Sequence, residues 1–254
     1  YAGIVAASVF GCTIVFTIPV GMGLIEEGDR PVFAKGIMLG LAAMPAALIT
    51  GGAVCGLGIG EILHQNLPVL VLALLLGIGL FRIPDGMVKG FEVFAVLIRT
   101  VITAGLVLAA VTYMTGFVVI PGMAPIEEAM AVVSSIGVVL LGSLPVTEFL
   151  QRRLKRPCTA LGARMGLDSI SVLGLLVSIV SPIPALVMMK DMNTFGKLVN
   201  VAYMVSSASM LAAHLGFTVS TEPDMLPALL VSKLAGCAAA IALGFITSKT
   251  KKRL

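Results

Sequence analysis

Residues 169–190 carry the sequence SISVLGLLVSIVSPIPALVMMK, in which Ser181-Pro182-Ile183-Pro184 interrupts an otherwise apolar run. Proline lacks a backbone N–H and its ring clashes with the preceding turn, so one straight helix is not expected to pass through this tetrapeptide. In lipid, an interrupted backbone is stable only where protein or a water-lined cavity satisfies its polar groups. Solute transporters place such interruptions near the middle of the bilayer, where the freed groups bind substrate. The segment therefore predicts a transporter.

The composition is that of a membrane protein. Hydrophobic residues make up 58% and charged residues 12% of the chain, and the mean hydropathy is +1.09, which excludes an ordinary soluble domain. Runs near the length of about 20 residues that a spanning helix needs are 3–24, 37–60, 67–81, 91–119, 129–150, 198–219 and 225–247. The run 67–81 is short and needs its flanks. We expect an all-α polytopic membrane protein with about seven spanning helices plus a re-entrant, Pro-broken helical hairpin.

The basic residues predict the path of this hairpin. If residues 169–190 enter and leave by one face, fifteen of the 17 Lys and Arg residues share that face, and the opposite loops 61–66, 120–128 and 220–224 hold none. A single crossing would divide them nine to six. The positive-inside rule therefore favours a re-entrant hairpin with a cytoplasmic C-terminus. Since the returning part of the hairpin is short, we expect it to extend toward Asn193. The fifteen residues are Arg30, Lys35, Arg82, Lys89, Arg152, Arg153, Lys155, Arg156, Arg164, Lys190, Lys197, Lys249, Lys251, Lys252 and Arg253.

Two apolar segments share a sequence pattern. Residues 7–17 read ASVFGCTIVFT and residues 208–218 read ASMLAAHLGFT, so Ala, Ser, Phe and Thr recur at equivalent positions. By the charge argument the two spans run in opposite directions, which is typical of an inverted-repeat transporter fold. We expect a single transmembrane domain over 1–254, with 1–60 as the end of a first repeat, 61–128 as connecting spans and 129–254 as the second repeat.

Short motifs in order along nearly the whole chain resemble those of one family. They are Cys12-Thr13-Ile14-Val15-Phe16-Thr17-Ile18-Pro19-Val20, Gly23-Leu24-Ile25-Glu26, Asp29-Arg30, Arg82-Ile83-Pro84, Gly90-Phe91-Glu92-Val93-Phe94-Ala95, Ile120-Pro121-Gly122-Met123-Ala124-Pro125-Ile126, Ile183-Pro184, Met188-Met189-Lys190-Asp191-Met192, Gly196-Lys197, His214-Leu215-Gly216-Phe217 and Lys233-Leu234. The chain is similar in these motifs to the ethanolamine-utilisation membrane protein family, the EutH ethanolamine permeases. The resemblance implies the C-terminal two-thirds of a family member, since members carry roughly a further third and an earlier helical break before the position of Tyr1.

The resemblance also implies a function. It indicates a bacterial inner-membrane permease for ethanolamine, a small cationic amino alcohol, serving ethanolamine utilisation. Two positions depart from the family pattern. Ala213 stands where the family usually has Asp, and Ser181 and Pro182 stand where it commonly has paired Asn. An acidic and an amide contact for the amino alcohol are therefore absent, which leaves the identity of the substrate open.

Several residues are candidates for substrate binding, and each has a purely structural alternative. Backbone carbonyls near Pro182 are free to accept from an ammonium group, unless the hairpin only packs against its neighbours. A polar side chain deep in a span is usually functional, although a His can also bond a neighbouring helix. A Thr often bonds its own helix, serines favour close helix packing, and a Phe ring either attracts a cation or simply packs. The candidates are Thr13, Phe16, Ser181, Pro182, Ser207, His214 and Phe217.

Two further residues carry charge at informative places. Lys233 lies about 12 Å inside the span 225–247, beyond easy reach of the interface, so we expect it to pair with backbone carbonyls or to gate the path. Asp168 precedes the hairpin helix and follows Arg164 by four positions, which predicts an N-cap with an ion pair.

Three other functions remain open beside ethanolamine transport. The first alternative is a sodium- or proton-coupled carrier of another small polar solute. The second is a membrane enzyme, which would need an acid, a base and a nucleophile that converge. A scaffold for an enzyme complex would leave the broken helix unexplained. We expect no enzymatic activity, no catalytic or metal site and no cofactor. The expected partners are the small-molecule substrate and membrane lipid, with no nucleic acid and a possible homo-oligomer.

Overall fold

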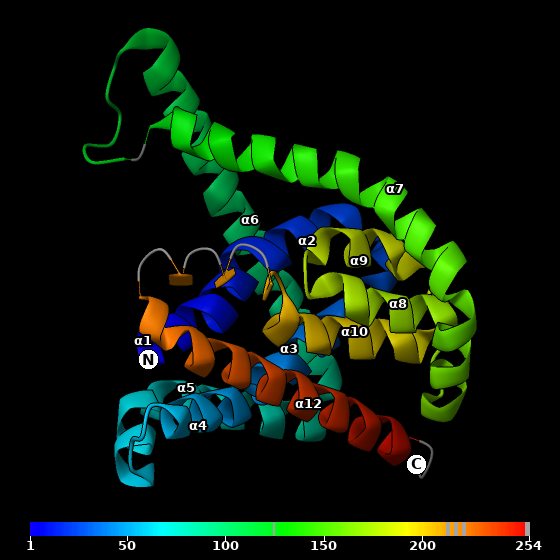
Figure 1. Ribbon diagram of the computed structural model, residues 1–254. Helices are drawn as coiled ribbons and strands as arrows, with labels where there is room; N and C mark the ends of the chain where they lie inside the picture. Colours follow the sequence, from blue (N-terminus) through cyan, green and yellow to red (C-terminus); the bar gives the residue numbers. More distant parts are fainter. Residues whose placement is uncertain (124, 212–213, 216–217, 220–221, 252–254) are drawn as a thin grey trace.

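The computed structural model describes residues 1–254 except 124, 212–213, 216–217, 220–221 and 252–254 (Figure 1). Every regular element in this part of the chain is helical, which confirms the expected all-α class. The helices are α1 (Ala2–Ala6), the π-helices η1 (Ala7–Gly11) and η2 (Thr13–Thr17), α2 (Ile18–Leu24), η3 (Glu27–Asp29), α3 (Arg30–Ala42), α4 (Met44–Val54), α5 (Ile59–Arg82), α6 (Pro84–Thr115), α7 (Ile126–Met165), α8 (Ser169–Ser178), α9 (Pro182–Met188), η4 (Met189–Asp191), α10 (Thr194–Ser207), η5 (Pro223–Met225) and α12 (Leu226–Lys251).

Several helices are long and apolar enough to cross a membrane. In the described chain they are Glu27–Val54, Ile59–Gly79, Asp85–Thr115 and Pro223–Ser248, and the bent pair Arg156–Met165 with Ser169–Ser178 adds a fifth if it counts as one span. The chain is therefore a multi-pass helical membrane protein. These residues do not reach the seven spans expected from sequence. The short run 67–81 does gain its length from its flank, because α5 begins at Ile59.

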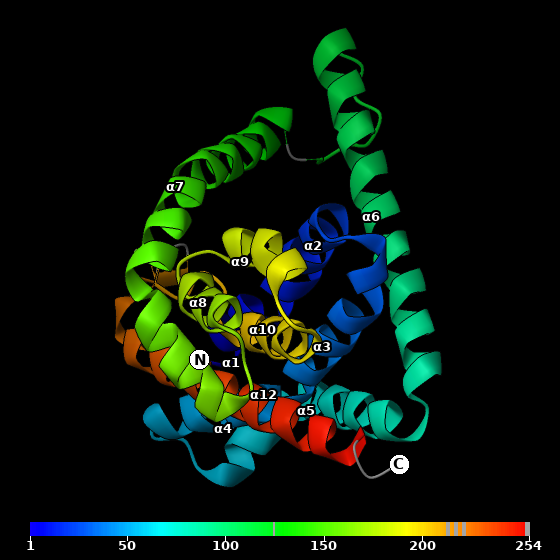
Figure 2. The ribbon, with the colours of Figure 1, turned by 90° about the vertical axis from the view of Figure 1, so that its right-hand side faces the viewer.

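Two expected boundaries are wrong. The span was expected to end with the apolar run 129–150, but the chain stays helical as far as Met165, because α7 continues through the following basic residues as a 40-residue helix. Lys and Arg are good helix formers, so the charges end the apolar run without ending the helix. α7 contains Pro145 and Pro157 and curves around the body of the molecule (Figures 1 and 2). The expected span 198–219 is also interrupted, since α10 ends at Ser207.

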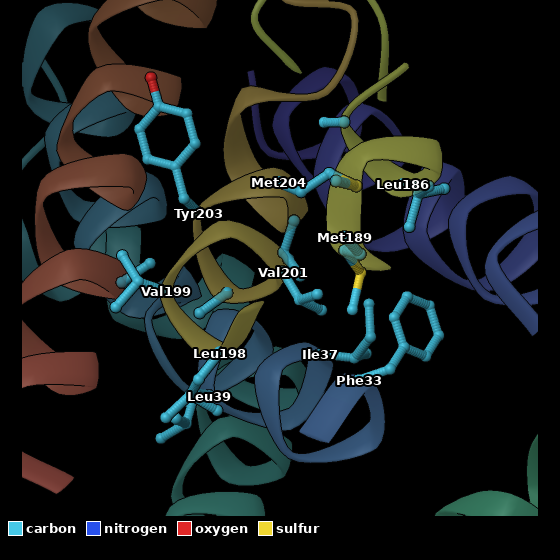
Figure 3. Close-up of a cluster of buried hydrophobic side chains, with 14 of the residues drawn as sticks. Phe33, Ile37, Leu39, Leu186, Met189, Leu198, Val199, Val201, Tyr203 and Met204 are labelled. Carbon is cyan, nitrogen blue, oxygen red and sulfur yellow. The ribbon is translucent and has the colours of Figure 1, made fainter. Parts of the chain in front are cut away.

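α10 lies at the centre of the molecule, with α3, α8, α9 and α12 around it (Figure 2). Its side chains from Leu198 to Ser207 are all buried. Figure 3 shows Val201 and Met204 facing Leu186 and Met189 of the hairpin, while Tyr203 points to the other side. The helix that carries the broken end is therefore held by apolar contacts on several sides.

Glycine permits the closest of these contacts. A Cβ atom on Gly40 of α3 would lie 2.6 Å from the Ala202 carbonyl oxygen of α10, and one on Gly36 would lie 2.6 Å from Val201 Cβ. The small-residue pattern Gly36-x-x-x-Gly40 is thus a site of close helix contact. The second such motif, Gly56-x-x-x-Gly60, is not, because nothing lies within 4 Å of a Cβ built on either residue. Gly56 instead takes φ +74° where α4 ends.

Residues 169–190 form a helical hairpin whose interruption lies slightly before the prolines. α8 ends at Ser178, the chain turns over residues 179–181, and Pro182 is the first residue of α9. Proline is favoured at this position because the first helical N–H has no partner inside the helix, and its φ is already helical. The expectation that no straight helix passes through Ser181-Pro182-Ile183-Pro184 is confirmed, because Ser181 is extended with φ −150° and ψ 134° just before Pro182. The prolines themselves lie in the first turn of the second helix.

One carboxylate joins the two ends of the hairpin. Asp168 Oδ1 accepts a hydrogen bond from Ser171 N at 2.6 Å, which confirms the predicted N-cap of α8. Its other oxygen accepts from Asn193 N, also at 2.6 Å. The returning chain therefore does extend to Asn193, as expected. The two ends of the hairpin therefore lie side by side. The Asp168 carboxylate binds two backbone N–H groups in place of the ion pair predicted with Arg164.

Replacing Gly40 tests the packing of α3 on α10. We expect Gly40→Ala to lower the free energy of unfolding by about 1–3 kcal/mol, because the new methyl group meets the Ala202 carbonyl. Gly77→Ala in α5 is the matched control, since its Cβ would have open space, and it should cause no loss because Ala is the better helix former. The melting temperature of the purified protein in detergent measures both. Equal effects would contradict the close approach.

Removing the Asp168 carboxylate tests the closure of the hairpin. Asp168→Ala should lower the free energy of unfolding by about 2 kcal/mol, because a helix cap and a charge-assisted bond to Asn193 are both lost. Asp191→Ala, an exposed carboxylate at the returning end of the same hairpin, should leave stability nearly unchanged. Thermal unfolding of the two variants side by side is the measurement, and similar melting temperatures would exclude this role for Asp168.

Candidate functional site

The central feature of the site is the interrupted end of α10. The helix ends at Ser207, Ala208 is extended with ψ 125°, and Ser209 has a positive φ of 53°. A left-handed conformation is uncommon for a residue other than glycine and costs of order 1–3 kcal/mol, so it persists only where its surroundings impose it. The last carbonyls of any helix lack partners inside the helix. Here Ala208 N and Met210 N bond the Met204 and Ser207 carbonyls, which leaves the Ser206 and Ala208 oxygens to other donors.

Lys233 of α12 supplies those donors. Its ammonium nitrogen lies 2.9 Å from the Ser206 carbonyl oxygen, 3.3 Å from that of Ala208 and 3.5 Å from that of Ser8. An ammonium group has three N–H donors, so the three carbonyls match its capacity. Lys233 is 0% exposed. Hydrogen bonds to charged groups contribute about 1.5–3 kcal/mol each, and the negative end of the α10 dipole adds to them. The expectation that Lys233 pairs with backbone carbonyls is confirmed.

The third carbonyl comes from the irregular start of the chain. Ser8 lies in η1, and η1 and η2 are both π-helical. Single π-helical turns are rare and frequently occur at functional sites, because the widened turn displaces backbone groups from their usual positions. Lys233 therefore joins two irregular backbones, the π-helical segment and the end of α10.

The turn of the hairpin meets the broken end of α10 directly. Ser178 Oγ and Ser207 Oγ are 2.9 Å apart and both side chains are buried. One residue further on, the Ile179 carbonyl accepts a hydrogen bond from Leu211 N at 3.1 Å. Two interrupted backbones thus satisfy each other, which is what the absence of water in a bilayer requires.

Two polar atoms near this junction have no hydrogen-bond partner among the described residues. They are Ser206 Oγ and His214 Nδ1. His214 is half-buried, its ring interacts with the Ala208 carbonyl, and it lies near Lys233. Buried polar atoms are nearly always paired, so each exception calls for an explanation such as an absent ligand or water. These two atoms therefore have hydrogen-bonding capacity that the described residues leave unused.

The predicted site residues divide into two groups. The structure brings Ser207, His214 and Lys233 together at the broken end of α10. Thr13 is buried but its hydroxyl bonds the Val9 carbonyl at 2.6 Å, which is the structural alternative. Ser181 does not cap α9 with its side chain.

The remaining predicted residues add little to this junction. Pro182 is buried as the first residue of α9, Phe16 is half-buried in η2, and Phe217 lies outside the described residues.

Sequence reasoning missed two contributors. Ser178 is the last residue of α8, and a polar residue just before an expected interruption is a signal that would have found it. The carbonyl of Ser8 leaves no such signal, because any residue type supplies a backbone oxygen. Only the π-helical geometry of η1 places it beside Lys233.

The fold and the site together describe a multi-pass helical membrane protein in which interrupted helices meet around the buried Lys233. Comparison with protein families gives the particular family: the family model for the ethanolamine utilisation protein EutH matches residues 1–247. The chain belongs to the EutH family. No solved structure matches the chain.

Three curated relatives illustrate the similarity. The "Probable ethanolamine permease EutH" of Listeria monocytogenes serotype 1/2a is 36% identical over 96% of this chain and 65% of its own length. The protein of the same name from Escherichia coli K12 is 36% identical over 95% of this chain and 65% of its own. The "Uncharacterized protein YxeR" of Bacillus subtilis 168 is 38% identical, with 100% of this chain and 70% of the relative covered. The chain thus spans about two thirds of the length of these relatives.

A double-mutant cycle tests the contact between the hairpin and α10. Ser178→Ala and Ser207→Ala should each lower the free energy of unfolding by about 0.5–1.5 kcal/mol, and the double variant should lose less than the sum because the bond is shared. Ser178→Ala combined with Ser232→Ala is the control pair, since Ser232 Oγ bonds Ala228 O of its own helix. That pair should be additive. Melting temperatures of all five variants give the coupling, and additivity in the first pair would refute the contact.

Proposed function

We propose that the protein is a permease that carries ethanolamine across the bacterial inner membrane along a path beside the junction of the α10 end and the hairpin turn. The observation that carries the proposal is the presence of unpartnered Ser206 Oγ and His214 Nδ1 at an interrupted helix inside an apolar, multi-pass protein. Transporters bind polar solutes at such interruptions. The substrate is inferred from the names of the relatives in Listeria and Escherichia coli.

The chemistry of ethanolamine fits these atoms. Its ammonium form has donors for a serine hydroxyl and for a neutral imidazole nitrogen, and its hydroxyl both donates and accepts. The carbonyls of Ser206 and Ala208 are already bonded to Lys233, so the substrate would use the side chains next to them. This role needs no cofactor, and it makes the protein a transporter and no enzyme.

The orientation in the membrane is part of the proposal. The hairpin 169–190 enters and leaves through the cytoplasmic face, and the C-terminus is cytoplasmic. Support comes from the carboxylate of Asp168, which binds Asn193 N at the far end of the hairpin, and from the one-sided distribution of Lys and Arg. A hairpin closed at its base cannot place its two ends on opposite sides of a bilayer.

The inverted repeat is likewise proposed. The matching motifs Ala7-Ser8 and Ala208-Ser209 both fall on irregular backbone, the first in η1 and the second just after α10. Both supply a carbonyl to Lys233. Related motifs that both fall on irregular backbone and both contribute a carbonyl to Lys233 support a duplicated unit.

Uptake of labelled ethanolamine tests the function. The full-length protein in proteoliposomes at acidic external pH should take up ethanolamine above empty vesicles, since the ammonium form crosses lipid poorly. His214→Ala should reduce uptake at low substrate by about tenfold, the effect of losing one bond to a charged group. His64→Ala is the control, because His64 is exposed on α5.

The outcomes separate the alternatives. Uptake equal to that of empty vesicles would exclude ethanolamine transport, and equal effects of the two His variants would exclude His214 from the path. Uptake that requires a sodium or proton gradient would favour the ion-coupled carrier of small polar solutes.

A further inference from the structure

The three carbonyls around Lys233 resemble the site of a small monovalent cation. They come from an interrupted helix end and from a π-helical segment, and unwound carbonyls of this kind coordinate the coupling cation in many transporters. The oxygens lie 2.9, 3.3 and 3.5 Å from the ammonium nitrogen. In channels, rings of backbone carbonyls replace the hydration shell of potassium in the same way. Ammonium and potassium ions are similar in size and charge.

The groups that act on Lys233 point to the same conclusion. Among the described residues they are the three carbonyls, the thiols of Cys12 and Cys237, and the imidazole of His214. None of these neighbours is a carboxylate. The ammonium group of Lys233 is therefore stabilised by carbonyl dipoles, without an ion pair among the described residues. A structural lysine deep in a protein normally needs an acidic partner. Carbonyl dipoles alone are typical of an ion site.

We propose that the carbonyl oxygens of Ser8, Ser206 and Ala208 form a monovalent-cation site whose occupant is the ammonium group of Lys233. The chain thereby carries its own cation, covalently attached to α12, and joins the first segment to the end of α10 without a free ion. Two consequences follow. The intact protein needs no sodium or potassium at this position, and removal of the lysine head opens a site that a free cation can fill. The site exists independently of the transported solute.

Replacement of Lys233 tests the proposal through stability, which does not depend on ethanolamine transport. The full-length protein is purified as wild type, Lys233→Ala and Lys233→Met. Each is melted in sodium, potassium, ammonium or N-methyl-D-glucamine chloride at equal ionic strength. Lys233→Ala creates space and frees the carbonyls, so at least one small cation should raise its melting temperature by about 3 °C or more over N-methyl-D-glucamine.

Lys233→Met is the matched control because it also removes the charge but keeps most of the volume. It and the wild type should respond to the four salts alike. The proposal is overturned if Lys233→Ala shows no preference for a small cation over N-methyl-D-glucamine, or if Lys233→Met shows the same preference.

Failure of Lys233→Ala to fold is also decisive. If the variant gives monodisperse protein only when purified in one of the small cations, the site is supported. If it aggregates in every salt, including propylammonium chloride, which restores the missing head group, the proposal is wrong. Ethanolamine uptake by the wild type is measured separately, so a failed transport assay and an absent cation site cannot be confused.

Discussion

Unpaired backbone carbonyls in an apolar interior must find donors, and the ammonium group of Lys233 provides them. Without it, the Ser206 oxygen would lose its hydrogen-bond donor and the Ala208 oxygen would lose one of its partners, and an unsatisfied backbone group costs several kcal/mol in a membrane. The interruption of α10, the left-handed Ser209 and the contact with η1 all depend on this side chain. The buried charge and the broken helix stabilise each other, since each would be unfavourable alone.

The hairpin contributes a second set of matched polar groups. Its turn gives a carbonyl to Leu211 and a hydroxyl to Ser207, so the interruption after α8 and that after α10 are paired across the core. Apolar packing brings them together: α10 is buried along its length, and Gly36 and Gly40 let α3 approach its backbone closely. The polar junction therefore sits on a rigid apolar frame, as a specific binding site requires.

The sequence predicted the all-α membrane class, the interruption within residues 169–190 and the pairing of Lys233 with backbone carbonyls. It did not predict the geometry that brings these parts together. Hydropathy and the proline pair located residues 169–190, because apolar length and backbone chemistry are local properties. The interruption at Ser207–Leu211 was missed because no Pro or Gly marks it. It depends on Lys233, which is distant in sequence, and on tertiary contacts that offset the strain at Ser209.

The same limit applies to α7 and to the site. The basic residues from Arg152 onward end the apolar run. Charged residues are compatible with a helix as well as with a loop, so α7 continues to Met165. Ser207 and His214 were recognisable as polar residues in an apolar span. Ser178, the partner of Ser207, and the Ser8 carbonyl, a partner of Lys233, became visible only when separate segments were placed side by side.

The carboxylate of Asp168 has a mechanical consequence. Because it binds both ends of the hairpin at one point, any displacement that kept these two bonds would move the hairpin as a unit about that base. Such a displacement would part Ser178 from Ser207 and Ile179 from Leu211 in the same movement. Opening would then be all-or-none, with closed and open arrangements and little population between them.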